Sequence, residues 1–154
     1  MDLNVIVLTG LAGGSLERLQ LARLAEAGFP GLRRSHGYVF QRLIDGSSTV
    51  GQLAKALGIT QQGASKQVRE LEDLGYVGRV PSPADARVRT IELTARGRAA
   101  VETAREVQAA LEAQVYEAVG PEKLAAAREA LTAMLTMTGD AARIPSRSVP
   151  LGEV

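Results

Sequence analysis

The chain has 154 residues, a length typical of one domain with short appendages, and its 45% hydrophobic and 23% charged content is ordinary for a globular protein. The absence of cysteine excludes disulfides, thiolate metal sites and cysteine nucleophiles, and His36 is the single histidine, which excludes a histidine-clustered metal site. We therefore predict no catalytic residue, metal site or cofactor. No apolar run reaches the about 18 residues that span a bilayer, and no Lys or Arg precedes Arg18, so we expect a cytoplasmic protein without a secretory signal or membrane partner.

The net charge of +1 conceals an asymmetry along the chain. Residues 33–98 hold eleven Lys or Arg against six Asp or Glu, whereas both flanking segments hold an excess of acidic residues. A basic module between acidic flanks is expected where one part of a protein meets a polyanion, and chance clustering on a solvated surface is the alternative. Aromatic residues make up only 3%, so the core is expected to consist of Leu, Val, Ile and Ala, largely in helices.

The N-terminal segment allows two interpretations. Helical spacing begins at Ser15, a suitable cap, and the Gly-Phe-Pro-Gly run at 28–31 ends this first helix. The pattern of residues 5–15 fits either a strand followed by a glycine-rich phosphate loop at 10–15 or a helix with flexible glycines. The loop is the best case for a nucleotide-binding enzyme, but no GK[ST] follows and the glycines do not fit G-x-G-x-x-G, so this is the weaker interpretation.

Three short helices and a hairpin follow. The spacing predicts helices over 32–44, over 50–57 with Ser48 or Thr49 as cap, and from Thr60 to residue 74. The period then changes to two, which predicts strands over 77–80 and 87–93 joined by a loop with two prolines.

The C-terminal part is helical again. Thr94 caps a long helix with apolar residues from Val101 to Val119, and a break at Gly120-Pro121 starts the last helix. The fold class is therefore mainly α with a small β-hairpin wing, a winged helix-turn-helix with N- and C-terminal dimerisation helices. We assign residues 1–31 to an N-terminal dimerisation helix, 32–98 to the DNA-binding lobe, 99–140 to C-terminal dimerisation helices and 141–154 to a flexible tail.

The helix from Thr60 has the character of a DNA recognition helix. Ala64, Val68 and Leu71 share one face, and the opposite face carries amides, a hydroxyl and cations without a carboxylate, which suits a major groove. An ordinary amphipathic helix is the alternative. With the wing arginines, the predicted DNA-binding residues are Thr60, Gln61, Gln62, Ser65, Lys66, Arg69, Arg87 and Arg89.

The hairpin places Arg79, Arg87 and Arg89 around Asp85. An arginine at a wing tip can enter a narrow minor groove, and we expect Asp85 to pair with Arg87 or a neighbour and hold the tip in shape. The alternative is a surface ion pair worth under about 1 kcal/mol.

Four runs of this sequence resemble MarR-family transcription regulators. They are LAKALGITQQ at 53–62, LEDLGYVGR at 71–79, PADAR at 83–87 and LTARGR at 93–98. The resemblance, over about residues 32–140, implies a winged helix-turn-helix homodimer that binds pseudo-palindromic operators on double-stranded DNA, usually as a repressor released by a small ligand. It gives Ser65 and Lys66 the Ser/Thr-Arg position of the recognition helix, Arg87 the wing arginine and Asp85 its acidic partner. Gly63-Ala64 departs from the bulkier residues of many relatives.

The resemblance also implies a ligand pocket between the dimerisation helices and the DNA-binding lobe. We expect His36 and Tyr38 to line it and Arg18 to meet an anionic effector, although a lone histidine is more often a structural hydrogen-bonding group. A winged helix that serves as a protein-interaction module is the competing hypothesis to DNA binding. The long apolar stripe of the C-terminal helices separately predicts a homodimer.

Overall fold

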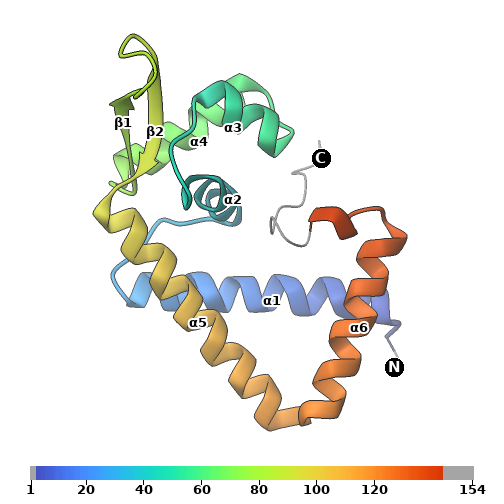
Figure 1. Ribbon diagram of the computed structural model, residues 1–154. Coiled ribbons are helices and arrows are strands. Elements are labelled where there is room, and N and C mark those ends of the chain that lie inside the picture. The colour runs from blue at the N-terminus through green and yellow to red at the C-terminus, as the bar shows by residue number, and fades with distance from the viewer. Residues whose placement is uncertain (1–2, 144–154) are drawn as a thin grey trace.

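Helices dominate the computed structural model, which describes residues 3–143 (Figure 1). Within these residues a two-stranded antiparallel hairpin follows four helices and precedes two more. The elements are α1 (Val5–Glu26), α2 (Arg34–Leu43), α3 (Val50–Leu57), α4 (Gln61–Asp73), β1 (Val77–Pro81), β2 (Arg89–Leu93), α5 (Ala95–Val119), α6 (Pro121–Met137) and the short 3-10 helix η1 (Ala141–Arg143). Most of the tail predicted over 141–154 lies outside the described residues.

Helix α1 begins ten residues before the predicted cap at Ser15. The side-chain Oδ1 of Asn4 accepts a hydrogen bond from the backbone N–H of Val7 at 3.0 Å, which caps the helix at its true start. Residues 5–14 are helical, so the interpretation of this run as a strand with a phosphate loop is wrong. Four consecutive apolar residues, 5–8, fit a strand or a helix equally well by period, and the Asn4 cap settles the choice.

Helices α2, α3 and α4 form the centre of the lobe. Thr49 caps α3 by accepting from the N–H of Gln52 at 3.1 Å, and Gly58 ends it with a φ of +66°. A residue with a side chain rarely adopts this φ, so the sharp turn into α4 suits glycine. The buried core comprises Val39, Phe40, Leu43, Leu53, Leu57, Val68, Leu71, Tyr76, Val77, Ile91 and Leu93 of the lobe, with Ala100 and Val101 from α5.

The wing is close to the prediction. Strand β1 pairs with β2 in a register that runs from Val77 opposite Leu93 to Pro81 opposite Arg89. Ser48 adds an antiparallel bridge to Ile91, with N–H···O distances of 3.0 and 2.8 Å. Arg87, predicted within a strand, instead lies in the turn before β2.

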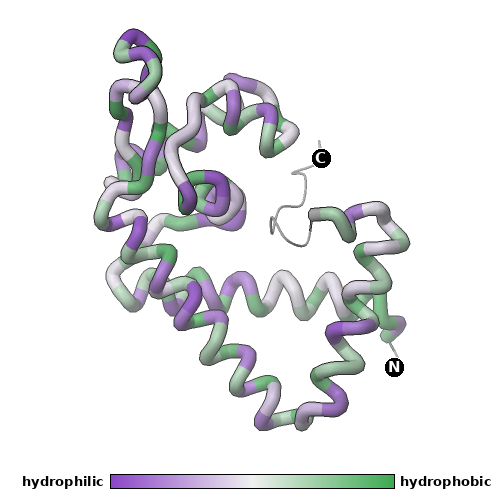
Figure 2. Tube along the Cα trace, viewed as in Figure 1, coloured by the Kyte–Doolittle hydropathy of each residue, from purple (hydrophilic) through white to green (hydrophobic). Residues whose placement is uncertain are grey.

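The start of helix α5 is anchored to the lobe. The Thr94 hydroxyl donates to the carbonyl of Gly75 at 2.7 Å and accepts from the N–H of Gly97 at 3.0 Å. Burial then decreases along α5, from Val101 at 8% exposed to Val119 at 40%. No described residue of α6 is buried, and Figure 2 shows hydrophobic residues continuing along α1 and α6 away from the lobe.

Candidate nucleic-acid interface

The two faces of α4 are as predicted. Ala64, Val68 and Leu71 are at most 1% exposed and pack into the lobe. The outer face presents Gln61, Gln62, Lys66 and Arg69 as exposed residues, with Ser65 half-buried.

Two carboxylates of α4, those of Glu70 and Glu72, are paired, whereas its two basic side chains have no partner among the described residues. Glu70 accepts from Arg33 and His36, and Glu72 pairs with Arg79, whose Nε lies 2.9 Å from Oε1. Within residues 3–143, Lys66 and Arg69 make no side-chain hydrogen bond or ion pair. The positive charge of the outer face is therefore free for an external partner, while two of the nearby carboxylates are occupied.

The N-terminus of α4 explains Thr60 and Gly63. Thr60 was predicted to contact DNA, and the structure makes it the N-cap, because its hydroxyl accepts from the N–H of Gly63 at 3.0 Å. A Cβ added to Gly63 would lie 3.2 Å from that hydroxyl oxygen. A side chain at position 63 would therefore require the Thr60 hydroxyl to shift slightly.

The wing tip differs from the prediction in its pairing. Asp85 was expected to pair with an arginine side chain, but its Oδ1 accepts from the backbone N–H of Arg87 at 2.9 Å. An aspartate readily bonds the backbone two residues ahead, and this shapes the turn without engaging the guanidinium. Arg79 does not pair with Asp85 either, because its guanidinium pairs with Glu72 at the end of α4. Arg87 and Arg89 remain exposed.

A cleft of about 780 Å³ lies between α1, α2 and α5. Its walls include Leu21, Phe40 and Leu111, and Arg34 and Tyr38 stand beside them, with Arg34 Nε donating to the Tyr38 hydroxyl at 3.2 Å. Of the three residues predicted for a ligand pocket, Tyr38 lines this cleft. Arg18 does not, because its guanidinium turns along α1 to Ser15 at 3.0 Å, and neither does His36.

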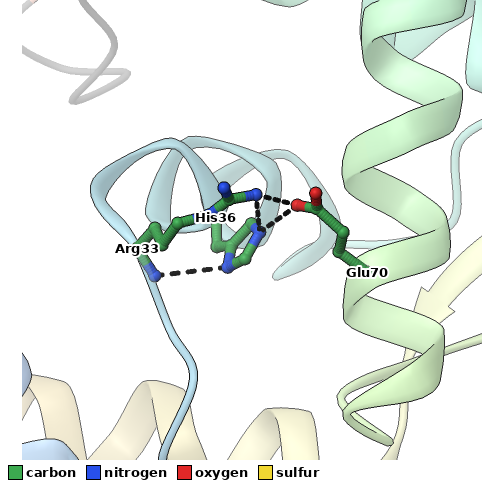
Figure 3. A network of polar contacts seen from close by, with 3 residues as sticks. All are labelled: Arg33, His36 and Glu70. Atoms are coloured by element: carbon green, nitrogen blue, oxygen red, sulfur yellow. Dashed lines mark hydrogen bonds and ion pairs between the residues drawn. The ribbon is translucent and has the colours of Figure 1, made fainter.

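His36 is 1% exposed and points from α2 toward α4 (Figure 3). Its Nδ1 accepts from the backbone N–H of Arg33 at 3.2 Å, and its Nε2 lies 3.2 Å from Oε2 of Glu70. Burial, followed by the charge of Arg33, lowers the pKa of His36 to about 4. The ring is therefore neutral near pH 7, with its proton on Nε2, and acts as a hydrogen-bonding group between two helices.

Two further observations concern residues 3–143. No three His, Cys, Asp or Glu side chains there gather into a group that could hold a metal ion. None of the helices there has the length and apolar character needed to cross a membrane.

Comparison with known proteins identifies the lobe. Residues 31–88 match the model of the MarR family. Over 54 residues the chain is 43% identical to the LexA repressor of Deinococcus radiodurans, a match that spans 35% of this chain and only 24% of that protein.

Solved structures share the fold over most of the chain. Reduced MarR from E. coli superimposes with a TM-score of 0.68 at 20% identity, covering 88% of this chain and 98% of MarR. A mutant of S. aureus MepR gives 0.69 at 20% identity, covering 88% and 99%. A second MepR mutant, bound to an oligodeoxyribonucleotide, gives 0.62 at 21% identity, covering 89% and 99%. Residues 31–88 are thus similar to the MarR family, and the chain shares the fold of these solved structures over most of its length.

Proposed function

We propose that the protein is a DNA-binding transcription regulator, a repressor that acts as a homodimer on a pseudo-palindromic operator and responds to a small ligand. The observation that carries DNA binding is the outer face of α4. It combines amides, a hydroxyl and two unpaired cations, while Glu70 and Glu72 are occupied by Arg33, His36 and Arg79. A carboxylate free on this face would repel phosphates.

In this proposal α4 enters the major groove. Gln61 or Gln62 can pair with adenine through two hydrogen bonds, and the ammonium group of Lys66 can donate to guanine. Arg87 and Arg89, exposed at the wing, reach the adjacent minor groove, where narrow A·T tracts concentrate negative potential. The hydrogen bond from Arg87 N–H to Asp85 shapes the tip while leaving the guanidinium available.

The homodimer is supported by apolar surface that one chain leaves exposed. Large apolar side chains seldom gather in this number on the surface of a monomer. A single lobe also contacts only half a site, whereas two recognition helices about one DNA turn apart match a palindrome. The exposed large apolar residues on α1, α5 and α6 are Val5, Ile6, Val7, Leu8, Leu11, Leu16, Leu19, Val115, Tyr116, Val119, Leu131 and Met137.

The effector is assigned to the cleft between α1, α2 and α5. Apolar walls with a few polar groups are typical of small-molecule sites, and Tyr38 and Arg34 supply the polar groups here. The proposed place of action is the cytoplasm, where the operator would lie.

The test is fluorescence anisotropy with the DNA upstream of the protein's own reading frame, titrated at several salt concentrations. Binding through several phosphates makes log K fall with log salt by about 0.9 per contact. We expect this steep slope and weaker binding by Arg87→Ala. No retention of duplex DNA at low salt would refute the proposal and favour a protein-interaction module.

A further inference from the structure

A polar cluster joins the N-terminus of α2 to the recognition helix. Arg33, His36 and Glu70 come together between the two helices, with Glu70 projecting from α4 toward the other two (Figure 3). Apolar packing between α2 and α4 is non-directional, so it does not fix where the Glu70 carboxylate points. The hydrogen bonds from Arg33 and His36 are directional, so they fix the orientation of the Glu70 carboxylate.

Two donors converge on one carboxylate oxygen of Glu70, and they lie 3.4 Å apart, from Arg33 Nη2 to His36 Nε2. Because Nδ1 of His36 accepts the backbone N–H of Arg33, the proton of the neutral ring is on Nε2, and it donates to Oε2 of Glu70. The guanidinium of Arg33 donates to the same oxygen. Glu70 thus has two donors from outside its own helix, one of them charged.

The position of Glu70 matters because Lys66 lies four residues before it on α4. Side chains at this spacing are neighbours on a helix surface, where a lysine and a glutamate form an ion pair. In the structure Lys66 has no such partner among the described residues, since Glu70 is turned to α2. A released Glu70 carboxylate would compete with DNA for the ammonium group of Lys66.

We propose that Arg33 and His36 are positioning residues for DNA binding, which hold Glu70 away from Lys66 and so keep that ammonium group available to the DNA. The inference rests on the proposed function and names residues outside the predicted DNA contacts. Neither Arg33 nor His36 needs to touch DNA for it to hold.

A double-mutant cycle tests this by anisotropy on the upstream DNA at fixed salt. Arg33→Gln is expected to weaken binding about two- to fivefold, the range of a surface ion pair. Glu70→Gln leaves no carboxylate to release, so adding Arg33→Gln to it is expected to cost nothing further. Equal losses from Arg33→Gln in both backgrounds would overturn the proposal, because Arg33 would then act as a direct phosphate contact.

Arg34→Gln is the matched control. It removes the same charge one residue away, but the guanidinium of Arg34 faces Glu17 of α1, with 3.7 Å between Nη1 and Oε2, and Tyr38 of its own helix. Its effect is expected to be the same with and without Glu70→Gln. If the effect of Arg34→Gln also changed when Glu70→Gln was present, the coupling would reflect the overall charge and not the Arg33–Glu70 contact, and the proposal would be overturned.

A second measurement needs no DNA and separates this inference from the proposed function. Carbodiimide links an amine directly to a carboxylate in contact with it, and peptide mass spectrometry quantifies the Lys66–Glu70 product. The yield is expected to rise in Arg33→Gln over the wild type and to stay low in Arg34→Gln. The side chain of Arg33 is 56% exposed, so its replacement should leave the fold intact. An unchanged yield would contradict the proposal even in a protein that binds DNA.

Discussion

Gly97, in the first turn of α5, lies directly against the backbone carbonyl of Tyr76, and a Cβ at this position would overlap the carbonyl oxygen. The same carbonyl accepts the N–H of Thr94 at 3.1 Å. The start of α5 is therefore packed onto the segment that leads from α4 into the wing. This close approach gives a physical reason for glycine in the Leu-Thr-x-x-Gly run at 93–97.

Gly97→Ala is expected to lower the free energy of unfolding by about 1–3 kcal/mol or more, because backbone atoms must shift to admit the methyl group. Urea denaturation of the wild type and the variant measures the difference. Gly37→Ala on α2 is the control, since a Cβ there meets nothing within 4 Å and should stabilise the helix by up to about 1 kcal/mol. Wild-type stability in Gly97→Ala would show that the contact is not tight in solution.

The buried, neutral His36 predicts a loss of stability in acid. Its pKa of about 4 in the folded state lies below the ordinary histidine value of 6.5, so between these pH values the unfolded chain binds more protons. The free energy of unfolding should fall as the pH decreases from 6.5 to 4, by up to about 3 kcal/mol from this group. Denaturation of wild type and His36→Gln across this range measures the difference, and it isolates the imidazole because His36 is the single histidine. Parallel pH profiles for the two proteins would refute the assignment.

The exposed apolar face of α1 predicts that Leu8→Glu weakens self-association. Leu8 is 48% exposed in the single chain, and a carboxylate placed inside a dimer core would be desolvated without a partner. Light scattering at micromolar concentration should give a dimer for the wild type and a smaller species for Leu8→Glu. Val88→Glu is the control, since Val88 is 40% exposed but lies on the wing. A monomeric wild type would exclude the homodimer.

Local signals in the sequence predicted most of the lobe. The Thr49 and Thr60 caps, the stop at Gly58 and the change of period after Tyr76 each involve residues within a few positions of one another, so the sequence alone carries them. The start of α1 was missed because its first four residues are apolar without a period.

The sequence predicted which residues of α4 are exposed, but not which ion pairs its glutamates form. Burial of Val68 implies the exposure of Lys66 and Arg69 through helical spacing alone. The contact between Glu70 and Arg33 joins residues 37 positions apart, and it forms only because the lobe packs α2 beside α4. The pair of Arg79 and Glu72 likewise depends on the packing of β1 beside the end of α4.

Binding of Lys66→Ala and Arg87→Ala to single-base variants of the operator tests whether α4 contacts bases while the wing contributes general affinity. We predict that Lys66→Ala loses discrimination at one position of each half-site, worth about 1–3 kcal/mol for a good base contact. Arg87→Ala should weaken every variant similarly, more so with A·T flanks, and retain the wild-type melting temperature. An equal loss of affinity by Lys66→Ala at all positions would show that Lys66 does not contact a base.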